Sequence, residues 1–152
     1  AWRNEISKCR CSLIESIINT EINHLDFGGA NGGISKIMTG RGYNSSNFEP
    51  DPTFAQASRD NGVKTFTDLD EIVNGHYNVI TSYDSLCYSV NIKSDLELIS
   101  KKLAKDSMFW GTFGYADYGL KNCPDLSFNY YLIIIQLLFN YYLNCDGVFP
   151  IN

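Results

Sequence analysis

Four glycines stand within six residues, directly after a short apolar segment, and this is the strongest local signal for chemistry in the chain. The segment runs from Ile22 to Phe27, and the glycines are Gly28, Gly29, Gly32 and Gly33. Glycine accepts a positive φ and lets the backbone approach a ligand closely. Residues 33–39 have helical spacing, so the turn leads into a helix N-terminus with free N–H groups and a partial positive charge. We expect this turn to bind a carboxylate or a phosphate, and the turn alone does not choose between them.

Strands and helices alternate regularly around this turn. Apolar residues at intervals of three and four predict a helix over residues 5–18. Further helices are expected at 33–39, 53–60, 69–73 and 94–105, and strands at 22–27, 43–48, 63–66, 77–82 and 108–113. Parallel strands need crossover connections, so this order predicts an α/β fold: a Rossmann-like, doubly wound, mostly parallel sheet with helices on both faces. Ligands of such sheets lie at the carboxyl ends of the strands, where the glycine turn falls.

The stretch that contains the turn resembles motif I of the class I S-adenosylmethionine-dependent methyltransferases. The family pattern Asp/Glu-x-Gly-x-Gly-x-Gly is met by Asp26, Gly28, Ala30 and Gly32, with an alanine in place of one glycine. The alanine also weakens the alternative dinucleotide fingerprint, which requires a second glycine beside the pyrophosphate. The resemblance implies that this turn, Gly29 included, binds the cofactor and that Asp26 contacts the methionine amino group. A purely structural role of Asp26, as an N-cap or loop anchor, is the alternative.

Three further places match the family in chain order. Glu49, which precedes Pro-Asp-Pro, resembles the acid that ends the second strand and accepts both ribose hydroxyls, although an acid there also fits NAD. Asp68, after the third strand, resembles the acid near the adenine, and a cap on a short helix is its alternative. Tyr83 and Asp84 fall in the region that faces the methyl donor and acceptor. The resemblance implies that they position the acceptor or, for Asp84, take its proton.

The resemblance covers residues 22–113 and implies S-adenosylmethionine as cofactor and methyl transfer to an unidentified, small-molecule acceptor. The methyl donor is already activated, so positioning and exclusion of water suffice, and neither a metal nor a catalytic triad is needed. Two alternatives stay open: an NAD-binding oxidoreductase, and a catalytically silent methyltransferase-like module that binds a partner or a second copy through a predicted helix at 128–145. We expect a single domain over 1–152, with a covering helix at 1–20 and a shortened or atypical segment at 126–152.

Composition and charge narrow the function classes. The 152 residues include 44% hydrophobic residues, enough for a real core, and the net charge of −5 disfavours nucleic acid as a partner. The five cysteines are odd in number and form no CxxC pair, which favours reduced thiols and a cytoplasmic location: Cys9, Cys11, Cys87, Cys123 and Cys145. The apolar segment at 130–143 is interrupted by Gln136 and Asn140 and predicts no membrane span. His24 and His76 lie near strand starts and are expected to be bystanders.

Overall fold

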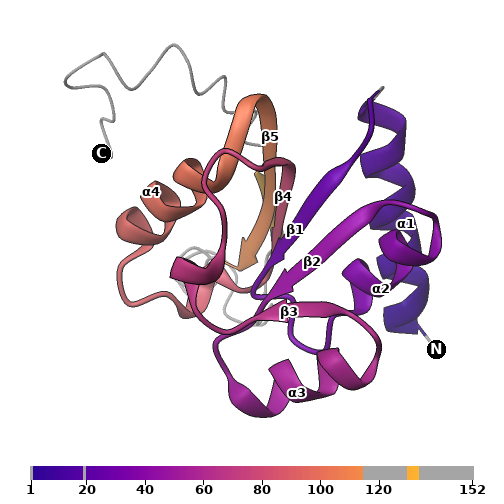
Figure 1. Cartoon of the computed structure of the whole chain (residues 1–152), viewed down its shortest axis with the longest axis horizontal. Coiled ribbons are helices and arrows are strands. Elements are labelled where there is room, and N and C mark those ends of the chain that lie inside the picture. Colours follow the sequence, from indigo (N-terminus) through magenta and orange to yellow (C-terminus); the bar gives the residue numbers. More distant parts are fainter. Residues whose placement is uncertain (1, 19, 115–129, 134–152) are drawn as a thin grey trace.

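The computed structural model of this chain describes residues 2–18, 20–114 and 130–133. Within these residues one six-stranded sheet runs in the order β3-β2-β1-β4-β5-β6 (Figure 1). The strands from β1 to β5 are parallel to their neighbours, and β6 is antiparallel to β5. Their bounds are β1 Asn23–Phe27, β2 Asn44–Phe48, β3 Lys64–Phe66, β4 Tyr77–Tyr83, β5 Leu103–Gly114 and β6 Tyr130–Ile133.

Helices cover both faces of this sheet (Figure 1). Helices α1 (Trp2–Ile17) and α2 (Gly33–Gly40) pack on one face through an apolar cluster that includes Ile14, Met38 and Val79. Helix α4 (Ile92–Lys102) packs on the other face, where Ile99 contacts a cluster that includes Ile80. Helix α3 (Pro52–Asp60) lies beside β3. The expected Rossmann-like α/β fold, with a mostly parallel sheet between two helical layers, is therefore confirmed.

The face of the sheet beneath α1 and α2 carries an unusual row of polar side chains. Strand register places Asp26 of β1 beside Asn47 of β2 and Thr81 of β4, and places His24 beside Ser45. Alternate residues of a strand point to the same face, so these five side chains share one face. All five are buried. Buried polar groups require hydrogen-bond partners, so the partners of these five side chains are important for the stability of the sheet.

The glycine turn and the order of elements are as expected, but two boundaries differ. Residues 103–105 were expected to end a helix, whereas α4 stops at Lys102 and β5 begins at Leu103. The side chain of Leu103 is buried, and its backbone pairs with Tyr77, which favours the strand over helix propensity. The helix expected at 69–73 is a single 3-10 turn, η1 (Leu69–Glu71), and a second 3-10 turn, η2 (Leu86–Tyr88), follows β4.

The helix expected at 128–145 is wrong where the structure describes this segment. Residues Tyr130–Ile133 form β6, which pairs with Gly111–Gly114 of β5. Short apolar runs rich in aromatic and β-branched residues fit a buried strand as well as a helix, and periodicity alone cannot separate the two. The other residues of that predicted helix lie outside the described residues, as do Cys123 and Cys145 and nearly all of the atypical segment expected at 126–152.

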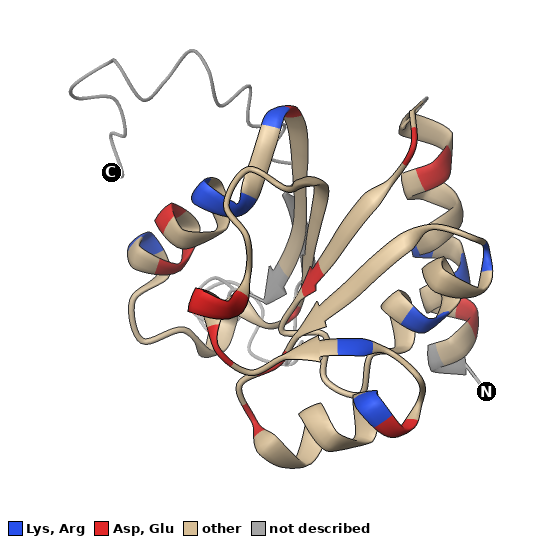
Figure 2. Ribbon diagram, viewed as in Figure 1, with Lys and Arg blue, Asp and Glu red and all other residues tan. Residues whose placement is uncertain are grey.

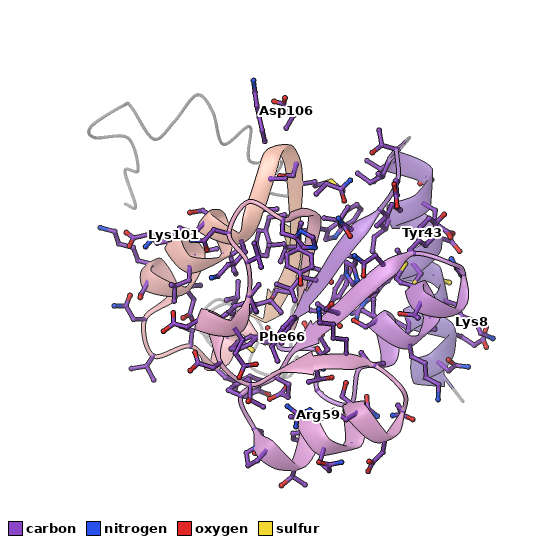
Figure 3. The ribbon with its side chains drawn as sticks, in the orientation of Figure 1. Lys8, Tyr43, Arg59, Phe66, Lys101 and Asp106 are labelled. Atoms are coloured by element: carbon purple, nitrogen blue, oxygen red, sulfur yellow. The ribbon has the colours of Figure 1, made fainter. Side chains whose placement is uncertain are left out.

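The surface of the described part mixes charges of both signs. Both α1 and α4 carry basic and acidic residues (Figure 2). Lys8, Lys101 and Asp106 point outward, while the space between sheet and helices is filled with side chains (Figure 3). At the β3 edge Lys64 is exposed, and its ammonium lies 5.0 Å from the ring centroid of Phe66. No helix among residues 2–18 and 20–114 is long and apolar enough to cross a membrane.

Replacing Ile14 tests whether α1 is an integral layer of the fold. Ile14 is fully buried against the sheet, whereas Ile17 of the same helix is 44% exposed. We expect Ile14→Ala to lower the free energy of unfolding by about 2 to 4 kcal/mol, because it leaves a cavity. The matched variant Ile17→Ala should change it by less than about 0.5 kcal/mol. Urea unfolding checks both, and equal effects of the two variants would contradict the packing of α1 described here.

Candidate functional site

The turn between β1 and α2 reverses sharply through left-handed backbone conformations. Gly28, Ala30 and Gly32 have φ values of 75°, 47° and 74°. The Gly28 amide donates to the Phe48 carbonyl at 2.8 Å, which ties the turn to the end of β2. A Cβ on Gly29 would overlap Asn47 Oδ1 and the carboxyl group of Asp26. Position 29 therefore requires glycine, because the backbone of the turn lies directly against these two buried polar side chains.

Asp26 lies directly beneath this turn with its carboxyl group almost out of solvent. The residue is 3% exposed, and its Oδ1 accepts a hydrogen bond from the Thr81 hydroxyl at 2.7 Å. Burial raises the pKa of Asp26 to about 6, partly offset by the Thr81 hydrogen bond and by the charge of Arg10, while Glu49 adds to the rise. Asp26 thus changes charge close to neutral pH, directly beneath the glycine turn.

Glu49 holds the other side of the turn. It follows β2 directly, is 7% exposed, and its Oε2 accepts from the Ala30 amide at 2.9 Å. Its Oε1 accepts from the Asp51 amide, also at 2.9 Å. Two backbone donors therefore fix the carboxylate against the turn.

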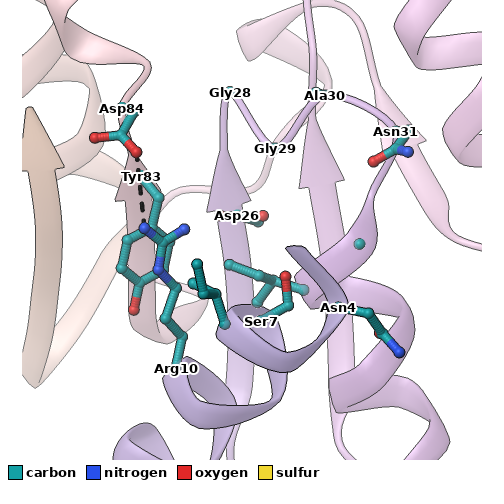
Figure 4. A pocket seen from close by; sticks show the side chains of 13 residues that line it. Asn4, Ser7, Arg10, Asp26, Gly28, Gly29, Ala30, Asn31, Tyr83 and Asp84 are labelled. Carbon is teal, nitrogen blue, oxygen red and sulfur yellow. Dashed lines mark ion pairs between the residues drawn. The ribbon is translucent and has the colours of Figure 1, made fainter. Parts of the chain in front are cut away.

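A cleft of about 830 Å³ opens between the glycine turn, α1 and the end of β4 (Figure 4). Asn4, Ser7 and Arg10 reach it from α1. Its lining also includes most of the residues assigned from the sequence, namely Asp26, Gly28, Gly29, Ala30, Tyr83 and Asp84. Gly32, Glu49 and Asp68 stand outside that lining. Most of the predicted site residues thus line one cavity. The glycine turn forms a wall of this cavity, and Glu49 is hydrogen-bonded to the turn without lining the cavity.

One wall of the cleft is an ordered group of charged and aromatic side chains. The Arg10 guanidinium lies 4.0 Å from the ring centroid of Tyr83 and 3.7 Å from Asp84 Oδ2 (Figure 4). Burial raises the pKa of the Tyr83 phenol, which therefore stays protonated and is available as a donor. Asp84 has a φ of 57°, rare for a residue with a side chain. Its amide donates to the Thr112 carbonyl at 2.7 Å, and its Oδ1 accepts from the Thr112 hydroxyl at 3.1 Å.

Asp68 is placed differently from the cleft residues. It is exposed, and its Oδ1 accepts from the Asp70 amide at 2.9 Å, so it caps η1. The capping alternative therefore describes the observed contact. Its position two residues beyond β3 is still at the carboxyl edge of the sheet, next to Glu49, whose amide donates to the Phe66 carbonyl at 3.0 Å.

Sequence reasoning missed two residues of this site, Arg10 and Asn47. Arg10 occupies a partly exposed position of an amphipathic helix, and no motif marks it. Asn47 is fully buried; its amide group donates to the Ala30 carbonyl at 3.0 Å and to the Ser58 hydroxyl at 3.1 Å. His24 lies near the start of β1, as expected, and outside the cleft lining, and its imidazole is linked to Asp26 through one intervening hydroxyl, that of Thr81. His76 is exposed at the opposite end of the sheet, before β4. The polar residues on one face of β1 and β2 were the available signal.

Solved structures with the same architecture include several methyltransferases. A TehB-like SAM-dependent methyltransferase from Corynebacterium glutamicum gives a TM-score of 0.61 at 19% identity, over 74% of this chain and 68% of that chain. A protein from Pyrococcus horikoshii gives a TM-score of 0.69 at 14% identity, over 83% and 64%. An S-adenosylmethionine-dependent methyltransferase from Mesorhizobium loti gives 0.59 at 13% identity, over 70% and 54%. No protein-family model and no curated protein sequence matches the chain.

These likenesses identify the fold of the chain. Sequence identities below 20% carry no substrate or activity across, but the shared architecture is that of the class I S-adenosylmethionine-dependent methyltransferases, as the glycine motif implied. The chain spans 54% to 68% of the length of the three structures.

Two acceptor oxygens lie close to the backbone of Gly29. Asn47 Oδ1 is buried and lacks a hydrogen-bond partner among the described residues, and it lies with Asp26 Oδ2 at the same side of Gly29. Of these two residues only Asp26 lines the cleft, and its carboxylate is an acceptor that suits a donor-rich ligand group such as an ammonium. Among the described residues no group of three His, Cys, Asp or Glu side chains could hold a metal ion.

Alanine at Gly29 tests the close approach of the turn to the polar row. The added Cβ must displace Asn47 or Asp26, and we expect Gly29→Ala to lower the free energy of unfolding by about 1 to 3 kcal/mol. Gly33→Ala is the matched control in the same turn, because its Cβ would meet its nearest neighbour, Asn31 Oδ1, at 3.8 Å. Urea unfolding measures both variants, and a neutral Gly29→Ala would contradict the close approach.

The raised pKa of Asp26 makes a prediction about pH. Since the pKa of Asp26 in the folded chain, about 6, exceeds the ordinary aspartate value of 3.8, the stability that protonated Asp26 contributes is fully present below pH 3.8 and is lost as the pH rises through 6. Asp26→Asn removes this loss of stability at high pH, because asparagine does not ionise. We expect the variant to be more stable than the wild type by about 1 to 3 kcal/mol at pH 8, and to show no such gain at pH 4.

The control for this prediction is Asp70→Asn, which removes an exposed carboxylate of η1. Urea unfolding of both variants at pH 4, 6 and 8 separates the effect of burial from that of net charge. A gain by Asp26→Asn that is equal at all three pH values would show that ionisation of Asp26 is not its cause.

Proposed function

We propose that this chain binds S-adenosylmethionine at the glycine turn and catalyses transfer of its methyl group to a small-molecule acceptor. The observation that carries the proposal is the pair of buried carboxylates on the two sides of one turn: Asp26 at the cleft and Glu49 behind Ala30. One carboxylate is suited to an ammonium group and the other to a pair of hydroxyls, and S-adenosylmethionine carries both groups. The fold supports the same conclusion.

The charges of the cleft match the amino-acid end of this ligand. Asp26 and Arg10 both line the cleft, and their charges are opposite. In the proposed complex Asp26 accepts from the methionine ammonium, and the Arg10 guanidinium attracts the methionine carboxylate. The amides at the start of α2 are further donors for that carboxylate. Arg10 reaches this place only because α1 packs across the opening of the turn.

Glu49 is the proposed ribose ligand. Its two oxygens each accept one backbone N–H in the present structure. A carboxylate oxygen has a second acceptor site, so Glu49 can accept ribose hydroxyls while the two amides keep its orientation. Asp68 lies at the same edge of the sheet and is the proposed neighbour of the adenine, with its capping role retained.

The acceptor is proposed to enter beside Tyr83 and Asp84. When bound, S-adenosylmethionine supplies an activated methyl group for in-line displacement by an acceptor oxygen, nitrogen or carbon. The protonated Tyr83 hydroxyl can orient such an acceptor, and Asp84 can receive its proton. Positioning of this kind supplies much of the acceleration of a reaction whose donor is already reactive.

A dinucleotide fits this turn less well. A pyrophosphate carries negative charge, and the ionised Asp26 lies in the cleft lining beside the turn. Two like charges at close range in a partly buried site repel each other strongly. The same carboxylate attracts the ammonium of S-adenosylmethionine, so the electrostatics of Asp26 favour the sulfonium ligand over NAD.

Calorimetry with the full chain tests the proposal. We expect binding of S-adenosylmethionine and S-adenosylhomocysteine, and none of NAD. Glu49→Gln should weaken binding of both sulfur ligands by about 1.5 to 3 kcal/mol, because hydrogen bonds of the ribose to a charged acceptor are lost. Glu97→Gln, which removes an exposed carboxylate of α4, is the control and should bind like the wild type.

Each of the other calorimetry results would favour a different function or remove a residue assignment. Unchanged affinity of Glu49→Gln removes the ribose assignment. Binding of NAD alone favours the oxidoreductase, and binding of none of the three ligands favours a catalytically silent module.

A further inference from the structure

A continuous chain of hydrogen bonds crosses three strands and ends on Asp26. The Ser45 hydroxyl lies 2.7 Å from His24 Nδ1, and His24 Nε2 lies 2.8 Å from Thr81 Oγ1. The Thr81 hydroxyl donates to Asp26 Oδ1 at 2.7 Å. His24 and Thr81 have no exposed surface, and Ser45 is 6% exposed. The chain therefore joins the interior of the sheet to the one carboxylate that lies at the cleft under the turn.

The direction of every proton in this chain follows from the charge of Asp26. An ionised carboxylate only accepts, so the single Thr81 proton points to Asp26. Thr81 Oγ1 must then accept from His24, which places the imidazole proton on Nε2. Nδ1 is left as an acceptor and takes the Ser45 proton. All donors point toward Asp26, and aligned hydrogen bonds polarise one another, which stabilises the negative charge at the end of the chain.

His24 is well suited to this role because it remains neutral. Burial lowers its pKa to about 3, so its imidazole carries no charge over the range in which Asp26 titrates. A neutral imidazole with one donor and one acceptor nitrogen fits between two hydroxyls. A charged imidazole would have two donors and would break the contact with Ser45, unless that hydroxyl turned round.

We propose that His24 is a positioning residue that acts through Thr81: it holds Asp26 Oδ1 as the acceptor of the chain and leaves the ionised Oδ2, on the side of Gly29, free for the amino group of the ligand. This proposal rests on the proposed binding of the S-adenosylmethionine amino group by Asp26. In this proposal the face of β1 toward α1 carries both Asp26, which contacts the ligand, and His24, which orients Asp26.

Other groups also act on Asp26, and the test must separate them from the chain. Arg10 of α1 lowers the pKa of Asp26 and Glu49 beyond β2 raises it. Burial raises the pKa of Cys11 of α1 and of Tyr83 of β4, and the charge of Asp26 adds to the rise in both. None of these four side chains belongs to the hydrogen-bonded chain, so variants of Thr81 and His24 leave them in place.

The first measurement follows the Asp26 carboxyl by carbon-13 NMR in the full chain without ligand. We expect Thr81→Val to raise the pKa of Asp26 by about one pH unit, because the direct hydrogen bond to the charged form is lost. His24→Leu should raise it by less, and Thr81→Ser, which keeps the hydroxyl, should restore the wild-type titration. Nitrogen-15 shifts of His24 should show a neutral ring with the proton on Nε2 at pH 8.

Thr65→Val is the matched control. Thr65 is a buried threonine of β3, and its hydroxyl contacts Ser58 at 2.7 Å and is not part of the chain to Asp26. The Thr65→Val variant should leave the Asp26 titration unchanged. An Asp26 titration that is unchanged in Thr81→Val or in a folded His24→Leu would overturn the proposal, as would a His24 proton on Nδ1 at pH 8. If His24→Leu does not fold, Thr81→Val and the tautomer still decide.

The second measurement is the affinity for S-adenosylhomocysteine between pH 5 and 8. Affinity should fall about tenfold per pH unit below the pKa of Asp26, and the midpoint of that fall should move with the titration in Thr81→Val. A midpoint that stays fixed while the carboxyl titration moves overturns the link to the ligand. Loss of all binding in the wild type refutes the proposed function instead, and the ligand-free titration still reports on the chain.

Discussion

The rest of the structure depends on keeping one nearly buried carboxylate satisfied. Asp26 is 3% exposed, and a charge in such a place requires hydrogen bonds or opposite charges. Thr81 supplies a hydroxyl from β4 and Arg10 supplies a positive charge from α1. Gly29 allows the turn to close over this carboxylate, which any side chain there would prevent. The turn, β4 and α1 thus each offset part of the cost of burying this one carboxylate.

The buried polar row affects stability in two opposite ways. Because the pKa of His24 is lowered on folding, the unfolded chain binds a proton below about pH 6.5 and the folded chain does not. Acid therefore favours unfolding in this pH range. The raised pKa of Asp26 means that the folded chain takes up a proton first, between about pH 6 and 4, so acid favours folding there. The two neighbours partly cancel each other, and mild acid disturbs the site less than either residue alone would suggest.

The sequence predicted the parts of the fold that follow from local rules. The glycine turn, the order of strands and the capped start of α3, where Asp51 accepts from two amides, all have local signatures. Even the polar strand β2 formed where expected, although Asn44, Ser45 and Asn47 have poor β propensity, because Ser45 is hydrogen-bonded to His24 of β1 and Asn47 to the glycine turn. Arg10 and the links of His24 were missed since they depend on contacts between distant segments. The strand at Tyr130–Ile133 was missed because its pairing with β5 is tertiary.

The shortness of β3 has a consequence for the behaviour of the chain in solution. This strand ends the sheet on one side, and its outer backbone groups are a possible template for a strand of another molecule. It offers only three residues, one of them the exposed Lys64, whose ammonium lies over the Phe66 ring. A short edge with a lysine makes intermolecular strand addition unfavourable. On this side the protein therefore carries its own protection against aggregation by sheet extension.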